Sequence, residues 1–140
     1  MTKAAKTLMR MTGNKCIVDT TIIIHIFKKR IAFAQRLQSL EEVFINSTVI
    51  GELYFGAYAS ENIQKKISEI EAFEKKCTVL NVTGETGKIF GQIKTQLKAK
   101  GRPIPENDIW IAAASAVEYN LPLYTTDNHF RDIDNLIFLE

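Results

Sequence analysis

The sequence has few of the residues and runs that would place it in a special class of protein. It has only two cysteines, Cys16 and Cys77, and they lack the paired spacing of a zinc site. No apolar run is long enough to cross a bilayer, and the basic N-terminus has no apolar segment of the kind found in secretory signals. These absences favour a cytoplasmic protein in which both cysteines are buried free thiols.

An excess of charge of one sign is also missing. The 18 lysines and arginines nearly balance the 16 acids, and a net charge of +2 is too small to indicate nucleic-acid binding by itself. Residues 1–14 contain cations but no acid, and we interpret them as a basic N-terminal tail whose order the sequence leaves open. Residues 15–140 are long enough to form one domain with a substantial core.

Hydrophobic patterning predicts strands that alternate with helices. Short apolar runs rich in β-branched residues predict buried strands at 15–19, 43–46, 78–82, 123–126 and 136–139. Apolar residues at helical spacing predict helices at 20–29, 33–40, 48–59, 62–76, 83–100 and 105–120. This alternation implies an α/β fold built of right-handed βαβ units, with a parallel sheet and helices on both faces.

Four carboxylates are expected to meet at one edge of this sheet. Asp19 and Asp127 each follow a predicted strand, and the carboxyl ends of parallel strands share an edge. Asp108 lies in the first turn of the helix at 105–120, and Glu52 lies in the second turn of the helix after the second strand. Buried carboxylates repel one another, and a hard divalent cation such as Mg²⁺ relieves this repulsion.

This set of acids favours hydrolysis of a phosphodiester bond, because a bound divalent cation can acidify water and stabilise charge on phosphorus. Polar neighbours of the acids are candidates to hold metal-bound water: Thr20, Thr21, Thr126 and Asn128. Three cations that precede the helix at 105–120 are expected to rim the same edge and hold a phosphate backbone: Lys98, Lys100 and Arg102. The alternative for these cations is a solvated helix face.

Each acid also has a purely structural interpretation. Asp19 and Asp127 could cap the turns that follow strands, and Asp108 could be a surface acid favoured by the helix dipole. Glu52 is the hardest to explain in this way, because its helix has little other polar surface and a lone buried glutamate is costly. The four acids together therefore favour the functional interpretation more strongly than any one of them alone.

Three other residues are given structural roles. His25 lies among isoleucines, which favours packing or an interface. His129 could contact substrate, but a structural hydrogen bond is the favoured role. Trp110 is assigned to packing, because no second aromatic residue accompanies it at a spacing useful for base stacking.

The segments that carry the acids resemble the motifs of one known family. They are IVDT at 17–20, STVIGEL at 47–53 followed by Gly56, IPENDIWIAA at 104–113, and LPLYTTDNHF at 121–130. The pattern resembles the PIN-domain ribonucleases and, within them, the VapC-type toxins of bacterial and archaeal toxin–antitoxin pairs. The match runs from about Lys15 to the C-terminus. Thr21 stands where many members have Asn or Ser, and it keeps a hydroxyl group.

The resemblance implies a three-layer α/β/α sandwich with a mainly parallel sheet of about five strands. It implies a Mg²⁺- or Mn²⁺-dependent endoribonuclease whose catalytic and metal-binding residues are Asp19, Glu52, Asp108 and Asp127. It also implies a homodimer that a small antitoxin neutralises, and surplus apolar surface on the helices at 20–29 and 48–59 fits such interfaces. Transfer, ribosomal and messenger RNA all remain open as the substrate.

Two other functions compete with this one. A phosphoacceptor domain of the receiver type has a similar topology and an acidic Mg²⁺ site. Such domains carry paired acids after the first strand and a lysine after the last, whereas Thr20 and Thr21 follow Asp19 and no lysine follows Gly101. A non-catalytic binding module is the third possibility, and the presence of all four acids argues against it.

Overall fold

The computed structural model describes residues 14–117 and 120–140, so nearly all of the expected basic tail lies outside the described residues. The strands are β1 (Lys15–Val18), β2 (Glu42–Asn46), β3 (Thr78–Leu80) and β4 (Leu123–Tyr124). The helices are α2 (Thr20–Phe27), α3 (Ile31–Gln38), α4 (Ser47–Tyr58), α5 (Ile63–Lys75), α6 (Gly84–Ala99) and α7 (Glu106–Val117), and a 3-10 helix, η1, covers Asn128–Asp132.

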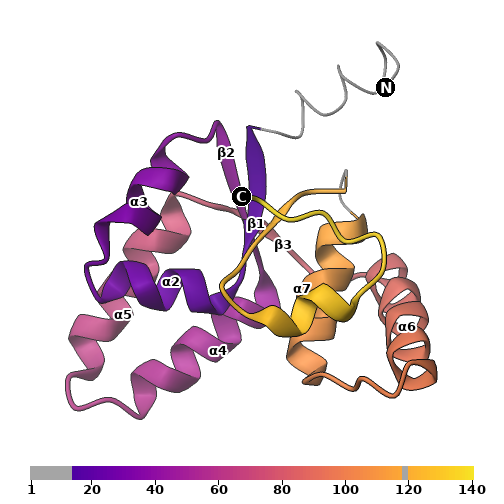
Figure 1. Ribbon diagram of the computed structural model, residues 1–140. Helices are drawn as coiled ribbons and strands as arrows, with labels where there is room; N and C mark the ends of the chain where they lie inside the picture. The colour runs from indigo at the N-terminus through magenta and orange to yellow at the C-terminus, as the bar shows by residue number, and fades with distance from the viewer. Residues whose placement is uncertain (1–13, 118–119) are drawn as a thin grey trace.

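The described strands form one parallel sheet in the order β3–β2–β1–β4. In the register of the sheet, Ile17 of β1 pairs with Phe44 of β2 on one side and with Leu123 of β4 on the other. Helices α2 to α5 lie to one side of the sheet and α6 and α7 to the other (Figure 1). The predicted α/β sandwich with a parallel sheet is therefore confirmed.

The predicted fifth strand at 136–139 is reduced to a single parallel bridge between Leu123 and Phe138. The Leu123 N–H donates to the Ile137 carbonyl (2.8 Å), and the Leu139 N–H donates to the Leu123 carbonyl (3.0 Å). Strand β4 ends at Tyr124 because the next residues turn, with the Asp127 N–H donating to Thr125 Oγ1 (2.9 Å). A two-residue strand cannot support a longer partner, so the described sheet has four strands.

The core holds β1 and α7 against each other and so fixes the edge where the acids lie. Cys16, Ile17 and Val18 of β1 have no solvent-exposed area, and neither do Ala112 and Ala113 of α7. Small residues on α7 let it lie close to its neighbours. Asp108, in the first turn of α7, is thereby placed at the carboxyl edge of the sheet.

Aromatic packing fixes the other side of α7. Trp110 stacks on Phe90 of α6 with ring centroids 4.0 Å apart, which confirms the packing role predicted for it. Further along α7, the buried Ser115 hydroxyl donates to the Leu121 carbonyl and so ties the helix to the segment that leads into β4. These contacts fix the position of α7 between α6 and the sheet.

Both cysteines are free thiols, as predicted. Cys16 is fully buried and Cys77 is half-buried, and burial raises the pKa of each thiol to about 12. Such thiols stay protonated and unreactive near neutral pH. Over residues 14–117 and 120–140, no helix has the length and hydropathy required to span a bilayer.

The tight packing of α7 gives a stability prediction. Ala113→Leu should lower the free energy of unfolding by about 1–3 kcal/mol, because a fully buried alanine in a packed core leaves no space for three extra carbons. Urea unfolding measures the change. Ala72→Leu on the exposed face of α5 is the matched control and should change stability by less than about 0.5 kcal/mol. Equal effects of the two substitutions would contradict the packing described here.

Candidate active site and metal centre

Asp19 is a buried carboxylate that its neighbours hold by three hydrogen bonds. It lies between β1 and α2 with 3% of its surface exposed. Its Oδ1 caps α2 by accepting the Thr20 N–H (2.8 Å), and its Oδ2 accepts the hydroxyls of Thr21 (2.9 Å) and Thr125 (2.8 Å). The cap role considered for Asp19 is therefore real, and it coexists with a position among the other acids.

Glu52 approaches Asp19 from α4. The Thr20 hydroxyl donates to Glu52 Oε1 (3.2 Å), so one threonine links the two acids. Burial raises the pKa of Glu52, the hydrogen bond from Thr20 lowers it, and the charge of Asp19 raises it further. A half-buried glutamate with a raised pKa is a better proton acceptor than a solvent-exposed one.

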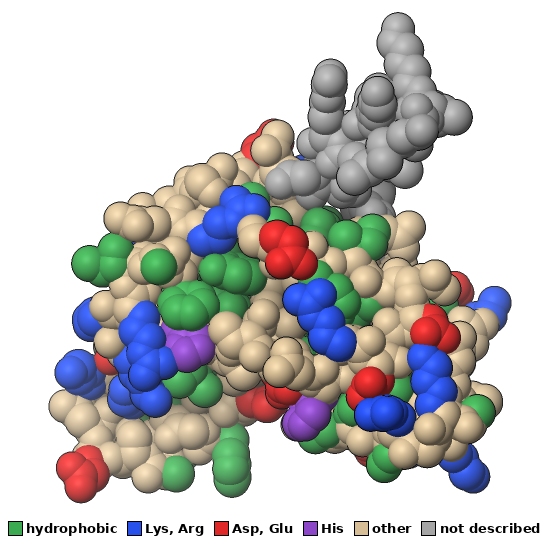
Figure 2. All heavy atoms as spheres, in the orientation of Figure 1, with side chains coloured by type: hydrophobic (Ala, Val, Ile, Leu, Met, Phe, Trp, Pro, Cys, Tyr) green, Lys and Arg blue, Asp and Glu red, His purple; other side chains and the backbone are tan. Residues whose placement is uncertain are grey.

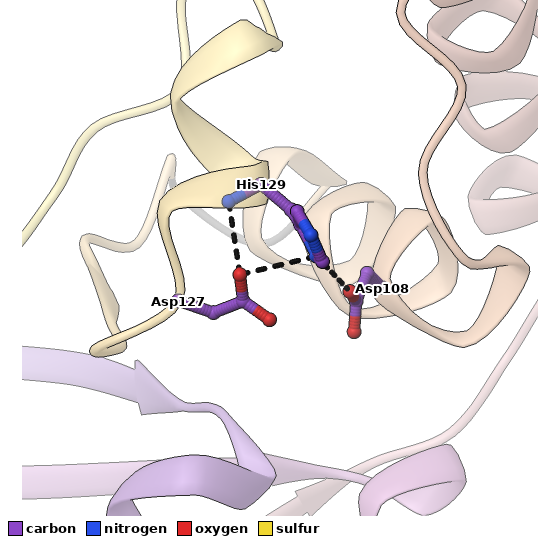
Figure 3. A group of neighbouring side chains, drawn as sticks. All are labelled: Asp108, Asp127 and His129. Atoms are coloured by element: carbon purple, nitrogen blue, oxygen red, sulfur yellow. Dashed lines mark hydrogen bonds and ion pairs between the residues drawn. The ribbon is translucent and has the colours of Figure 1, made fainter.

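Asp108, Asp127 and His129 form a compact group on the other side of the site (Figure 3). Asp127 caps η1, and its Oδ1 accepts the His129 N–H (2.9 Å). The ring of His129 points between the two carboxylates, with Nδ1 3.1 Å from Asp127 Oδ1 and 3.7 Å from Asp108 Oδ2. One ligand atom from each residue lies within 4.8 Å of the others.

The charges of the other three acids act on Asp108. The pKa of Asp108 is raised from 3.8 to about 6, first by burial and then by the charges of Asp19, Asp127 and Glu52, whereas His129 lowers it. Carboxylates that follow two different strands and lie on two different helices therefore come together at one edge. The sequence predicted this convergence from strand ends and helix starts alone.

This group of donors fits a divalent cation. Asp108, Asp127 and His129 can each offer one ligand atom, and the raised pKa of Asp108 reports an excess of negative charge that a cation would relieve. Mg²⁺ prefers carboxylate oxygens, and Mn²⁺ also accepts an imidazole nitrogen. The candidate ligands are therefore the four acids, with His129 as an additional donor.

The polar residues predicted to flank the acids divide into two groups. Thr20 and Thr21 bond directly to Glu52 and Asp19. The Thr126 N–H instead donates to Thr21 Oγ1 (3.3 Å), and its own hydroxyl lies 3.4 Å from His25 Nε2. Asn128 is exposed at the start of η1, and within the described parts of the chain its side chain makes no hydrogen bond to an acid.

The predicted phosphate-binding cations lie at the end of α6, near the start of α7 (Figure 1). Lys100 pairs with the Asp134 carboxylate and donates to the Asp132 carbonyl (2.9 Å), so its charge is already compensated. Lys98 and Arg102 are exposed. The sequence did not reveal this pairing, because Asp134 is distant along the chain and reaches Lys100 only in the folded protein.

Sequence reasoning missed the role of Thr125 and underestimated that of His129. The Thr125 hydroxyl donates to Asp19 and accepts the Asp127 N–H, so it joins the two acids that follow strands. The available signal was the position of Thr125, a hydroxyl residue two positions before Asp127 at the end of the predicted strand. The ring of His129 approaches two carboxylates, which is more than the single structural hydrogen bond predicted for it.

The repulsion at Asp108 gives a stability prediction with a defined sign. Its raised pKa means that the folded state holds the proton more tightly than the unfolded chain does. The stabilisation is therefore full below about pH 4 and is lost as the pH rises through about 6. Asp108→Asn should raise the free energy of unfolding of the metal-free protein near pH 7.5 by about 1–2 kcal/mol, after allowance for solvent screening.

Urea unfolding in EDTA at about pH 4 and about pH 7.5 checks this prediction. The exposed Glu71→Gln is the charge-matched control and should show no such pH dependence. A lower stability of Asp108→Asn near pH 7.5 would mean that the acids do not repel one another. Adding Mg²⁺ should stabilise the wild-type chain more than the variant.

Comparison with known proteins agrees with this geometry. The PIN domain family matches residues 16–136. Ribonuclease VapC2 of Haemophilus influenzae is 34% identical over 127 residues, which cover 89% of this chain and 94% of that protein. The tRNA(fMet)-specific endonuclease VapC of Shigella flexneri is 30% identical over 70% of this chain and 76% of its own length.

Solved structures of VapBC complexes are also similar to this chain. VapBC-1 from nontypeable Haemophilus influenzae is similar with a TM-score of 0.80 and 31% identity, over 89% of this chain and 96% of that chain. VapBC2 from Rickettsia felis, bound to a DNA fragment from its promoter, has a TM-score of 0.83 and 26% identity over the same shares. The chain therefore belongs to the PIN-domain family and, within it, to the VapC ribonucleases.

Proposed function

We propose that this chain is the toxin of a toxin–antitoxin pair, a metal-dependent endoribonuclease that hydrolyses RNA phosphodiester bonds. The observation that supports this most directly is the convergence of Asp19, Glu52, Asp108 and Asp127, where burial and the charges of the other three acids together raise the pKa of Asp108 to about 6. Ribonuclease VapC2 and the tRNA(fMet)-specific endonuclease VapC are relatives whose names support cleavage of RNA. A cytoplasmic location follows from this substrate and from the two free thiols.

We propose Mg²⁺ or Mn²⁺ as the cation, held by the four acids with His129 beside them. When bound, such a cation lowers the pKa of a coordinated water and stabilises the charge that develops on the phosphate. Thr21 and Thr125 hold Asp19 in place through its Oδ2. Thr20 holds Glu52 through Oε1, which leaves Oε2 to accept the proton of the attacking water.

A phosphoacceptor of the receiver type is less well supported. Such a site needs a lysine beside the acids. Within residues 14–117 and 120–140, the only ion pairs of Asp108 and Asp127 are with His129, and the hydrogen-bonded partners of Asp19 and Glu52 are threonines. The arrangement therefore favours hydrolysis over phosphoryl storage.

We propose that the partners are a small antitoxin and a second copy of this chain. The solved relatives are VapBC complexes, and some of them are bound to DNA. The chain exposes apolar side chains on α2 and α4, with Ile24 41% exposed, Tyr58 63% and Phe55 80%. Exposed apolar surface of this kind is typical of protein interfaces.

The nuclease function predicts metal-dependent cleavage of RNA. Purified protein should cut a mixed cellular RNA pool into discrete fragments with Mg²⁺ or Mn²⁺ and not with EDTA. Asp108→Asn should cleave at least about 100-fold more slowly, because it removes a ligand carboxylate worth several kcal/mol of transition-state stabilisation. The exposed Glu85→Gln on α6 is the charge-matched control and should cleave as the wild type does.

Full activity of Asp108→Asn would contradict the proposed mechanism. If the wild type does not cleave RNA, there are two explanations, and mass spectrometry of the same sample distinguishes them. A small bound protein would identify an antitoxin that blocks the site. A sample without one would favour a non-catalytic binding module.

The role of Thr125 predicts a change in metal affinity. Thr125→Val removes the donor to Asp19 and the acceptor of the Asp127 N–H, so the metal concentration for half-maximal cleavage should rise about 10-fold. Activity should recover in part at high Mg²⁺, and Thr125→Ser should restore the wild-type requirement. Thr95→Val on the exposed face of α6 is the control. An unchanged metal requirement in Thr125→Val would show that Thr125 does not position the acids.

A further inference from the structure

The carboxyl end of α2 carries an exposed cluster of three consecutive cations, Lys28, Lys29 and Arg30, which we call the α2 cationic cluster. Within residues 14–117 and 120–140, none of the three pairs with a carboxylate, in contrast to Lys100. In Figure 2, Lys and Arg side chains gather beside one histidine over α2, and acidic side chains gather beside the other histidine over η1. Both groups lie on the same face of the molecule.

The backbone of the cluster holds a lysine where glycine is normally found. The Lys29 N–H donates to the Ile26 carbonyl (2.9 Å) and the Arg30 N–H to the His25 carbonyl (3.1 Å), which is the pairing of a Schellman motif. Lys29 has φ +63°, in the left-handed region. The other described non-glycine residues with positive φ are asparagines, which tolerate this conformation better. The lysine is therefore kept at some loss of stability.

A row of polar groups joins this cluster to the acids. Arg30 Nη1 donates to His25 Nδ1, which leaves the hydrogen of the neutral ring on Nε2, 3.4 Å from the Thr126 hydroxyl. The Thr126 N–H donates to Thr21 Oγ1 (3.3 Å), and the Thr21 hydroxyl donates to Asp19 (2.9 Å). His25 is held in this row by stacking on Phe33, with ring centroids 4.3 Å apart.

Lys28 approaches the acids by a second route. It lines a hollow of about 180 Å³ that Thr20 and Glu52 also line. The α2 cationic cluster therefore borders the acidic site both through this hollow and through the row of Thr126 and His25. A chain bound across the acids would pass these cations first on the α2 side.

We propose that the α2 cationic cluster, with His25 and Thr126, is the subsite that binds the phosphates of the RNA strand next to the cleaved bond. This proposal rests on the proposed nuclease function and names where its substrate lies. It differs from the expectation that Lys98, Lys100 and Arg102 hold the backbone. Lys100 is already paired with Asp134. Lys98 and Arg102 have no carboxylate partner in the described residues, but no hydrogen-bonded row there joins them to the acids, as one joins the α2 cationic cluster. RNA is favoured over an acidic protein segment because the polar row leads to the acids, which the substrate must reach and a protein partner need not.

Binding of RNA to charge-matched variants tests the subsite. A fluorescent single-stranded RNA of about ten nucleotides would be titrated into Asp108→Asn protein, so that cleavage does not interfere. Adding Lys28→Ala with Lys29→Ala should weaken binding about 10-fold at about 50 mM salt and reduce the slope of log affinity against log salt by about 1.4. Lys65→Ala with Lys75→Ala on the exposed face of α5 makes the same charge change and should leave both unchanged.

Cleavage kinetics distinguish a role of Lys28 and Lys29 in RNA binding from a purely structural role. In the chain that keeps Asp108, Lys28→Ala with Lys29→Ala should raise KM about 10-fold at low salt and leave kcat within about twofold. Lys29→Gly should raise Tm by about 1–3 °C by relieving the positive φ, and should weaken RNA binding about threefold. If Lys29 serves only to end the helix, Lys29→Gly would change Tm and leave RNA binding unchanged.

Three outcomes would overturn the proposal. One is RNA binding by the Lys28→Ala, Lys29→Ala protein equal to that of the α5 control. Another is weaker binding only in Lys98→Ala with Arg102→Ala, which would put the strand on the other side of the acids. The third is loss of a co-expressed antitoxin with unchanged RNA binding, which would assign the cluster to a protein. A wild type that mass spectrometry shows to be free of bound protein, and that binds RNA through these cations but does not cut it, would refute the nuclease function and keep the cluster as an RNA-binding site.

Discussion

Repulsion among four carboxylates is the constraint around which this structure is organised. Folding brings Asp19, Glu52, Asp108 and Asp127 to one edge, where burial and, after it, the charges of the other three acids raise the pKa of Asp108 to about 6. Threonine hydroxyls hold the most buried of them, since Asp19 accepts hydrogen bonds from Thr21 and Thr125 in addition to the backbone. The folded protein thus accepts a loss of stability to keep these acids together, which the cation that we propose would relieve.

The packed elements that hold the acids in place, β1 and α7, lie directly behind them. Strand β1 lies between β2 and β4 with its last three residues fully buried, and Asp19 follows directly after it. Helix α7 packs its alanines into the core on one side and stacks Trp110 on Phe90 on the other, so the first turn that carries Asp108 cannot move away from the repulsion. Rigid packing of this kind keeps like charges together, and His129 offsets only part of their repulsion.

The lysines and arginines are distributed differently from the acids. Lys100, at the end of α6, forms an ion pair with Asp134, whereas Lys98, Arg102 and the cations at the end of α2 have no carboxylate partner in the described structure. The Schellman turn at Lys29 sets the backbone of the α2 cations, and the contact with His25 holds the side chain of Arg30. Acids and unpaired cations lie on one face, which gives a polyanion both a reactive site and a place to bind.

The sequence by itself determined the order of strands and helices, the edge where the acids meet, and the four acids themselves, because these follow from local periodicity and from the shared direction of parallel strands. Tertiary structure decided the rest. The segment at 136–139 became a single bridge because β4 is only two residues long. Thr125, His129 and the pairing of Lys100 with Asp134 depend on which residues meet across the fold. Such contacts join positions far apart in the chain, and only the folded geometry brings their side chains within hydrogen-bonding distance.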